Sequence, residues 1–239
     1  MTGFTKKLLL ITTIVWISNF GFSQSNEIII KFIASCSLHI TDGESNLYID
    51  FPYKSGAYKY TAIFNKGVPV CPIYDKSEID NIKDNAIFIF THKHADHYSR
   101  KILKKLDGKI YGPWNIAELE ELNSSIPNFN IQAFKTKHKV FGISWKHYSY
   151  LITWHGKKIY ISGDTGDVEH VNKIKDIDWF FTNHWLYSNA RDEKVNIDAK
   201  NIAIYHLKVN VKFTGEIPNH LLMLTTEKQG DIIKIPFIK

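Results

Sequence analysis

The sequence has little of what several classes of protein need. Among its 239 residues are two cysteines and no Cys-x-x-Cys pair, which excludes a thiolate zinc ribbon and a disulfide-rich scaffold. Seven prolines and 13 glycines are too few for a collagenous or linker-like chain, and no internal repeat indicates a solenoid or propeller. A Gly-x-Ser-x-Gly nucleophile motif is also missing. What remains is an ordinary globular composition, 44% hydrophobic and 23% charged.

Concentrated positive charge is missing too, although the formal net charge is +6 at pH 7. The densest basic runs are the pairs Lys104-Lys105 and Lys157-Lys158, and no basic stripe is interleaved with aromatic residues. We therefore expect a mildly basic, solvated surface and no nucleic-acid partner.

The N-terminus has the pattern of a signal peptide. Two lysines precede an uncharged apolar stretch over residues 8–22, and the small residues Gly21 and Ser23 at its end have the spacing that a signal peptidase prefers. The stretch is shorter than the ~20 residues of a membrane span. We predict cleavage after Ser23 or Gln24, with residues 1–23 as signal peptide and residues 24–239 as a single domain. The mature protein would be periplasmic or secreted, without stable membrane insertion.

Strand patterns rich in β-branched residues run through the mature chain, with short helical patterns between them. Asn196 is interpreted as the cap of a brief helix that begins near Ile197. Two strand-rich halves, each followed by helices, predict an α+β sandwich of two sheets with helices outside. The expected strands cover residues 27–34, 37–41, 46–50, 60–64, 85–91, 110–111, 130–135, 143–154, 158–162, 178–182, 202–206, 221–225 and 231–235.

The densest chemistry lies in residues 92–97, directly after a strand predicted to be buried. This six-residue segment contains four possible metal ligands: His92, His94, Asp96 and His97. In an extended or loop backbone, His92 and His94 can point toward one metal ion. Asp96 and His97 can then face a second ion. Imidazole and carboxylate together suit zinc, iron or manganese, not calcium or magnesium.

This His-x-His-x-Asp-His motif resembles the signature of the metallo-β-lactamase superfamily. Residues 46–52 are similar to its early strand ending in Asp-Pro, here with Phe51 intervening. Residues 162–166 (Ser-Gly-Asp-Thr-Gly) resemble the loop that carries a bridging aspartate, and residues 202–206 resemble the late strand that ends in the last histidine. The resemblance implies a four-layer αββα metallo-β-lactamase-type sandwich with a two-metal site at the edge between the sheets.

The resemblance also implies a ligand set. His92 and His94 would bind the first metal together with a histidine from the middle of the chain. Asp96 and His97 would bind the second metal together with the last histidine. Asp164 would bridge the two, because a carboxylate has an oxygen for each. Two zinc ions are expected, with iron or manganese as alternatives.

Two histidines of this set have to be chosen among candidates. His138, in the loop before the long hairpin, is preferred as the middle ligand. His147 lies inside a hairpin strand, and His155 lies in the turn. His206 is preferred as the last ligand, because it follows a short helix and a strand as the resemblance requires. His184 ends the preceding strand, where it could be an outer hydrogen-bond donor, a proton source for the leaving group, or a histidine packed under a tryptophan.

A centre of this kind, together with the signal-peptide pattern, predicts an exported metal-dependent hydrolase. Two cations lower the pKa of a shared water, and Asp96 would act catalytically by orienting that nucleophile. We expect a small-molecule substrate with an ester, lactone, amide or phosphodiester bond. The Gly-Asp-Thr-Gly loop followed by Asp167 looks most like the lactonase and phosphodiesterase branches. The alternatives are an iron-dependent redox member of the same superfamily and a non-catalytic binding protein.

Two structural features are left open by the sequence. Cys36 and Cys71 are interpreted as buried thiols, with a disulfide as the alternative that export would permit. Aromatic residues of segment 53–73, Tyr58 among them, and residues 185–191 are expected either to form the rim of a substrate pocket or simply to pack over a sheet.

Overall fold

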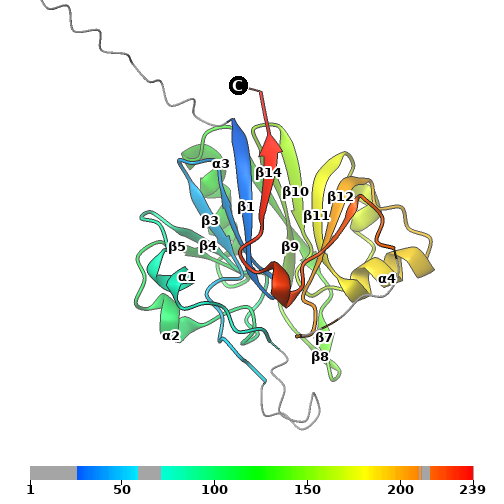
Figure 1. Cartoon of the computed structure of the whole chain (residues 1–239), viewed down its shortest axis with the longest axis horizontal. Helices are drawn as coiled ribbons and strands as arrows, with labels where there is room; N and C mark the ends of the chain where they lie inside the picture. Colours follow the sequence, from blue (N-terminus) through cyan, green and yellow to red (C-terminus); the bar gives the residue numbers. More distant parts are fainter. Residues whose placement is uncertain (1–25, 59–70, 210, 212–215, 239) are drawn as a thin grey trace, which may run out of the picture.

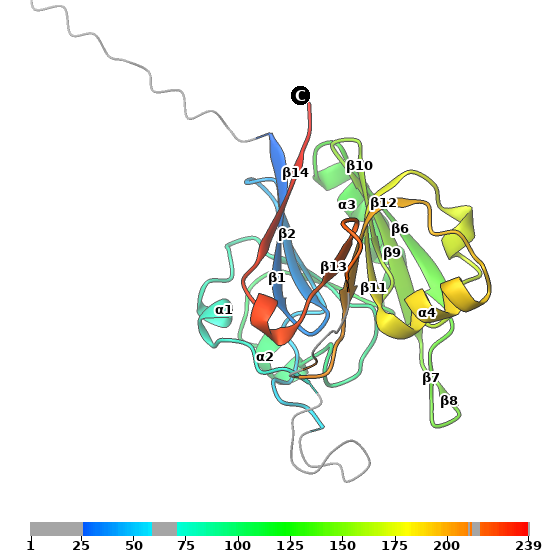
Figure 2. The ribbon, with the colours of Figure 1, turned by 45° about the vertical axis from the view of Figure 1, so that its right-hand side comes forward.

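The computed structural model describes residues 26–58, 71–209, 211 and 216–238. In these residues, two six-stranded sheets face each other and short helices lie on their outer surfaces (Figures 1 and 2). The expected signal peptide, residues 1–23, and the strand expected over residues 60–64 lie outside the described residues. None of the described helices is long and apolar enough to cross a membrane.

The first sheet is built from the N-terminal strands and closed by the C-terminal strand. Strand β1 pairs antiparallel with both β14 and β2, β2 pairs antiparallel with β3, and β3, β4 and β5 run parallel to one another. Alternation of buried and partly exposed side chains along β1 places Ile28 and Ile30 in the interior. In spatial order the strands are β14 (Ile232–Pro236), β1 (Glu27–Ala34), β2 (Ser37–Thr41), β3 (Asn46–Ile49), β4 (Ile87–Ile89) and β5 (Lys109–Tyr111).

The second sheet contains the long predicted hairpin. It turns at His155 and Gly156, whose φ angles of 47° and 76° are those that a two-residue hairpin turn needs. Strands β10 to β13 run parallel. In spatial order the strands are β13 (Leu221–Met223), β12 (Ala199–Tyr205), β11 (Ile177–Asn183), β10 (Lys157–Ile161), β9 (His147–Trp154) and β6 (Phe129–Thr136). A small separate hairpin joins β7 (Lys139–Val140) to β8 (Ile143–Ser144).

The fold has four layers, helices–sheet–sheet–helices, and an apolar cluster fills each of the three spaces between them. The largest fills the space between the sheets, and Trp154 and Phe181 are fully buried within it. A second cluster packs Leu103 of α2 against the outer face of the first sheet, and a third packs Leu186 of α4 against the outer face of the second. Figure 2 shows α1 and α2 on one flank and α4 on the other, which confirms the predicted α+β sandwich. The α-helices are α1 (Ser77–Asp80), α2 (Arg100–Leu103), α3 (Leu122–Ser125) and α4 (His184–Asp192).

The prediction of a helix that begins near Ile197 is wrong. The chain around Asn196 leads directly into β12, and the helix of this region is α4, which begins one residue after β11. Asn183 caps α4, since its side-chain oxygen accepts a hydrogen bond of 2.7 Å from the N–H of Leu186. His184 is therefore the first residue of a helix, not the last residue of a strand.

Candidate metal centre

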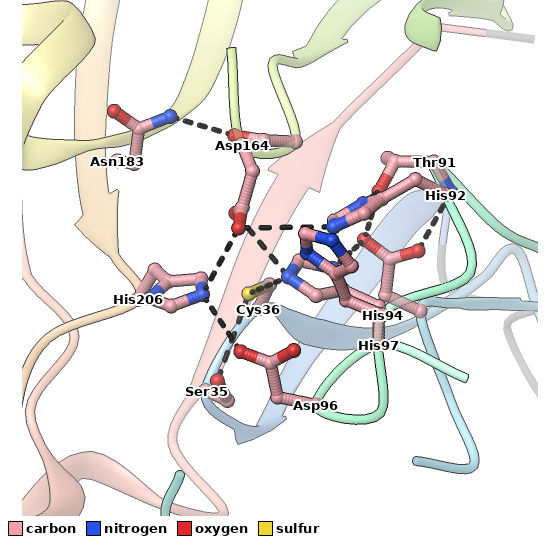
Figure 3. Close-up of polar contacts among 12 residues, drawn as sticks. Ser35, Cys36, Thr91, His92, His94, Asp96, His97, Asp164, Asn183 and His206 are labelled. Atoms are coloured by element: carbon pink, nitrogen blue, oxygen red, sulfur yellow. Dashed lines mark hydrogen bonds and ion pairs between the residues drawn. The ribbon is translucent and has the colours of Figure 1, made fainter. Parts of the chain in front are cut away.

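The loop after β4 carries the His-x-His-x-Asp-His motif into the interior at the edge between the sheets. A tight turn closes it, because the N–H groups of His97 and Tyr98 both donate to the carbonyl of His94, at 3.0 and 2.9 Å. His92 and His97 are completely buried. Figure 3 shows the imidazoles of this loop converging on Asp164, which comes from the loop after β10.

One group of ligand atoms comes from His92, His94, His138 and Asp164, which each offer an atom within 4.8 Å of the others. His138 Nε2 lies 3.3 Å from His94 Nδ1, and His92 Nε2 lies 3.8 Å from Asp164 Oδ2. Nitrogen and oxygen ligands at ~2.0–2.1 Å around a tetrahedral zinc are separated by ~3.3–3.4 Å. The separation between His138 and His94 matches this value, the one between His92 and Asp164 is longer, and the four ligand atoms together surround a space that could hold one cation.

A second group forms on the other side of Asp164. His97 Nε2 lies 3.2 Å from Asp164 Oδ1, and His206 Nε2 lies 3.3 Å from Asp164 Oδ2. His206 Nε2 is also 3.3 Å from Asp96 Oδ2. The sulfur of Cys36 lies 3.5 Å from His97 Nε2 and belongs to a set with His97, Asp164 and His206. Asp164 is thus common to both groups.

Several buried polar atoms in these groups have no hydrogen-bond partner among the described residues: His92 Nε2, Asp96 Oδ1, Asp164 Oδ1 and His206 Nε2. A buried polar atom left in this state costs about 1–3 kcal/mol. His92 Nε2, Asp164 Oδ1 and His206 Nε2 can each offer a lone pair to a cation in one of the two groups, and Asp96 Oδ1 lies beside them. The residues present therefore fit a metal centre.

Outer hydrogen bonds fix the orientation of the ligands. The Asp50 carboxylate accepts from Thr91 Oγ1 at 2.8 Å and from His97 Nδ1 at 2.8 Å. Thr91 Oγ1 in turn lies 3.0 Å from His92 Nδ1. With both Nδ1 atoms engaged, the Nε2 atoms of His92 and His97 are the ones that face the centre. Sequence reasoning assigned Asp50 no role, although it is the aspartate of the Asp-Phe-Pro segment.

His147 is close to the centre but belongs to neither group of ligand atoms. Its Nε2 accepts a hydrogen bond from the backbone N–H of Asp164 at 2.9 Å. Its Nδ1 therefore carries the proton and donates to Thr136 Oγ1 at 2.7 Å. Both ring nitrogens are used, so His147 supports the loop that carries Asp164 and has no lone pair left for a metal.

Burial lowers the pKa of some histidines at the site, whereas a neighbouring carboxylate raises the pKa of others. Burial lowers the pKa of His94 to about 4 and that of His147 to about 3. Burial also opposes the charge on His97 and His206, but the Asp164 carboxylate outweighs it and raises the pKa of both well above the usual value. Those imidazoles in turn hold the pKa of Asp164 well below its usual range against burial. Positive charge is therefore favoured beside Asp164.

A cleft of about 720 Å³ opens onto the centre, and His94, Asp96, Asp164 and His206 reach its surface. Its wall combines aromatic rings with lysines. The ring of Trp145 lies 4.2 Å from that of His94, centroid to centroid. The aromatic wall consists of Tyr58, Phe141, Trp145 and Trp185, and the lysines are Lys93, Lys137, Lys139 and Lys208.

The rim differs in part from the expectation. Tyr58 and Trp185 line the cleft, which is the first of the two alternatives that the sequence left open, while residues 59–70 of segment 53–73 lie outside the described residues. Sequence reasoning missed the β7–β8 hairpin, which contributes the exposed Phe141. A short apolar turn of this kind lacks the periodicity from which a strand or a helix is predicted.

The structure also places the other predicted positions. His184 lies at the start of α4 and lines the cleft, but it belongs to neither group of ligand atoms. His155 pairs with Asp42 at 2.9 Å, away from the centre. Cys36 and Cys71 are both buried and free, so the prediction of two buried thiols is confirmed.

No family model and no curated protein matches the chain. Several solved structures do. A metallo hydrolase of the archaeon Ignicoccus hospitalis is 12% identical with a TM-score of 0.61, covering 89% of this chain and 100% of its own. The isothiocyanate hydrolase of Delia radicum gut bacteria is 16% identical, with a TM-score of 0.58 and coverages of 86% and 98%. A metallo-β-lactamase fold protein of Bacillus subtilis is 13% identical, with a TM-score of 0.52 and coverages of 87% and 99%.

Structural similarity at sequence identities this low shows a shared fold and does not show a shared function. The chain has the metallo-β-lactamase fold, as the resemblance of its motifs predicted, and metal-dependent hydrolases are among its structural neighbours.

Proposed function

We propose that the chain is a metal-dependent hydrolase with a centre for two zinc ions. The observation that carries this proposal is the position of Asp164, whose carboxylate belongs to both groups of ligand atoms. A carboxylate shared in this way holds two cations at the short separation that hydrolytic two-metal sites use.

In this proposal each side of Asp164 contributes three further protein ligands. His138 and the first two histidines of the motif face one cation, and His206 with the end of the motif faces the other. The full ligand set is His92, His94, His138, Asp96, His97, His206 and Asp164.

When bound, the cations would lower the pKa of a water molecule toward neutrality and polarise the bond to be cleaved. Asp96 would orient the attacking water, because its Oδ1 is buried without a partner among the described residues while the side chain borders the cleft. His184 lines the same cleft and would give a proton to the leaving group.

The cleft favours a small substrate with an apolar body and a polar or anionic end. Its aromatic rings offer contact area, and its four lysines offer attraction to negative charge. An ester, lactone, amide or phosphodiester bond is compatible with this wall. An isothiocyanate joins these candidates because of the neighbour that is named for hydrolysing one.

The test is a hydrolysis panel of chromogenic phosphodiesters, lactones, β-lactams and an isothiocyanate, run on protein of known metal content. Asp164→Ala should lose bound metal and all turnover, since it removes the shared ligand of both groups. Asp167→Ala is the matched control, because this carboxylate of the same loop faces Lys137 at 3.4 Å instead of the centre. Asp164→Ala with two metals and full activity would refute the proposal. Tight iron with no hydrolysis would favour the redox alternative.

We also propose that the enzyme is exported and works in the periplasm or outside the cell. The support is the sequence pattern of residues 1–23. N-terminal sequencing of the protein from its native host should find a start at Gln24 or Ser25. A start at Met1 in a cytosolic fraction would contradict this part of the proposal.

A further inference from the structure

Cys36 reaches the centre from a part of the chain that the metal-binding motif does not include. It lies in the turn between β1 and β2, 61 residues before His97. The side chain is completely buried, and its sulfur lies 3.5 Å from His97 Nε2. Figure 3 shows the sulfur directed at the space between His97 and Asp164. One atom each from Cys36, His97, Asp164 and His206 lies within 4.8 Å of the other three.

We propose that Cys36 is a thiolate ligand of the cation that His97, Asp164 and His206 hold. The inference rests on the proposed metal centre and adds to it a sulfur donor, which makes this position selective for a thiophilic cation. Zinc accepts thiolate beside imidazole and carboxylate, whereas manganese and magnesium prefer oxygen.

The distances match a tetrahedral zinc. Ligands at ~2.3 Å for sulfur and ~2.0–2.1 Å for nitrogen are separated by ~3.6 Å around the ion. The observed separation between Cys36 Sγ and His97 Nε2 is 3.5 Å. The separation of 3.2 Å between His97 Nε2 and Asp164 Oδ1 is close to the ~3.3–3.4 Å expected for a nitrogen–oxygen edge, and His206 Nε2 lies 3.3 Å from the other oxygen of the same carboxylate, Oδ2.

A hydrogen bond between thiol and imidazole is the competing explanation of the short contact. His97 Nδ1 donates to Asp50 at 2.8 Å, so the neutral imidazole has its lone pair on Nε2. That lone pair can accept the thiol proton or bind a cation, but it cannot do both. Once a cation is present, the Cys36 thiol either releases its proton to solvent and coordinates or has only Ser35 Oγ, 3.6 Å away, as a partner.

Buried atoms near Cys36 that lack hydrogen-bond partners favour coordination of a cation over a hydrogen bond between thiol and imidazole. Asp164 Oδ1 and His206 Nε2 are buried and have no hydrogen-bond partner among the described residues, although each lies near the other ligand atoms. The Asp164 side chain is only 7% exposed. Atoms that are close together without hydrogen bonds are expected where lone pairs converge on one ion. In this tetrahedral set Cys36 takes the place that the proposed ligand set gives to Asp96, whose carboxylate can then hold the water.

Cys71 provides a matched control. It is the other cysteine of the chain and is also buried, but it packs in a different apolar cluster with Tyr53 and Tyr74. Its thiol donates to the carbonyl of Pro72 at 3.6 Å, and it belongs to neither group of ligand atoms.

The experiment is cobalt(II) titration of the metal-free full chain, followed by absorption spectroscopy, on wild type, Cys36→Ser and Cys71→Ser. Visible d–d bands report cobalt in any protein site, and a near-ultraviolet thiolate-to-cobalt band reports sulfur ligation alone. Wild type and Cys71→Ser should show both. Cys36→Ser should keep the d–d bands, lose the near-ultraviolet band, and bind its second zinc more than ~100-fold more weakly, since even outer partners of a metal site contribute ~10–100-fold.

The outcomes separate this inference from the proposed function. Visible bands without the thiolate band in wild type would overturn the Cys36 assignment and leave the metal centre intact. No cobalt uptake at all would overturn both. If Cys36→Ser does not fold, the Cys71→Ser spectrum still decides. A retained thiolate band then belongs to Cys36, and a lost band refutes the proposal.

Discussion

Replacing Gly163 by alanine tests the packing that holds the proposed bridging carboxylate. Gly163 has φ +61°, in the left-handed region where a side chain is unfavourable. A Cβ atom there would lie 2.5 Å from His147 Nε2 and 2.9 Å from the Cβ of Thr91. Both neighbours are completely buried and cannot move aside easily. The new methyl group would therefore displace His147 from the N–H of Asp164.

Two contributions determine the loss of stability. The left-handed conformation costs a residue with a Cβ about 1–2 kcal/mol. Overpacking of a closed interior adds about 1–3 kcal/mol. Gly156→Ala isolates the first contribution, because Gly156 has φ +76° and a Cβ added there would meet no atom within 4 Å. We expect Gly163→Ala to lower the free energy of unfolding by about 2–5 kcal/mol and Gly156→Ala by about 1–2 kcal/mol.

Urea unfolding of the metal-free chain measures the two losses, and competition with a chelator measures zinc affinity. Zinc affinity should fall about 10–100-fold in Gly163→Ala, because an outer partner of the centre is displaced, and should stay unchanged in Gly156→Ala. Equal stability losses in the two variants, together with equal zinc affinities, would show that the contact between Gly163 and His147 does not support the centre.

Two further predictions concern other parts of the molecule. Asp42→Asn removes the charged partner of His155 at 2.9 Å and should cost about 1–2 kcal/mol at pH 7. Burial opposes the Asp42 charge, but hydrogen bonds outweigh it and keep the Asp42 pKa below 3.8, so this stability is present above pH 3.8 and is lost as the pH falls through the folded pKa. Urea unfolding at pH 7 and pH 3 should show the difference shrinking; a constant difference would refute the linkage. Metal counting by mass spectrometry should find one equivalent lost in His138→Ala and one in His206→Ala, and both retained in His147→Ala; the opposite pattern would reverse the ligand assignment.

The sequence predicts this fold well because its signals are local. β-branched runs mark the strands, and His155-Gly156 marks a hairpin turn. The histidine motif follows an apolar run that is indeed the buried strand β4, so its place at a strand end could be predicted from neighbouring residues alone. The helix α4 was not predicted, because His184, its first residue, was interpreted as the end of the strand before it.

The supporting residues of the site could not be predicted, because their partners are distant in the sequence. Asp50 contacts His97 across 47 residues, and Cys36 contacts it across 61. Asp50 belongs to the Asp-Phe-Pro segment, but its contact with His97 cannot be inferred from its neighbours in the sequence, and Cys36 lies in no motif at all. His147 could be assigned to a strand, but which atom its ring nitrogens would meet depends on how β9 packs beside the Gly163 loop.

Backbone conformation explains how these distant residues come to face one point. Ser35, Asp50 and His206 each have a positive φ, of 56°, 48° and 56°, and each lies at the end of a strand, after β1, β3 and β12. The N–H of His206 donates to the carbonyl of Ser35 at 2.9 Å, which ties two of these turns together. A left-handed residue with a side chain costs about 1–2 kcal/mol, so three at one site persist only because surrounding hydrogen bonds and packing impose them. The same turns direct Cys36 and His206 toward Asp164. The orientation of the ligands is therefore built into the strand ends, and the chain presents its centre already arranged for a cation.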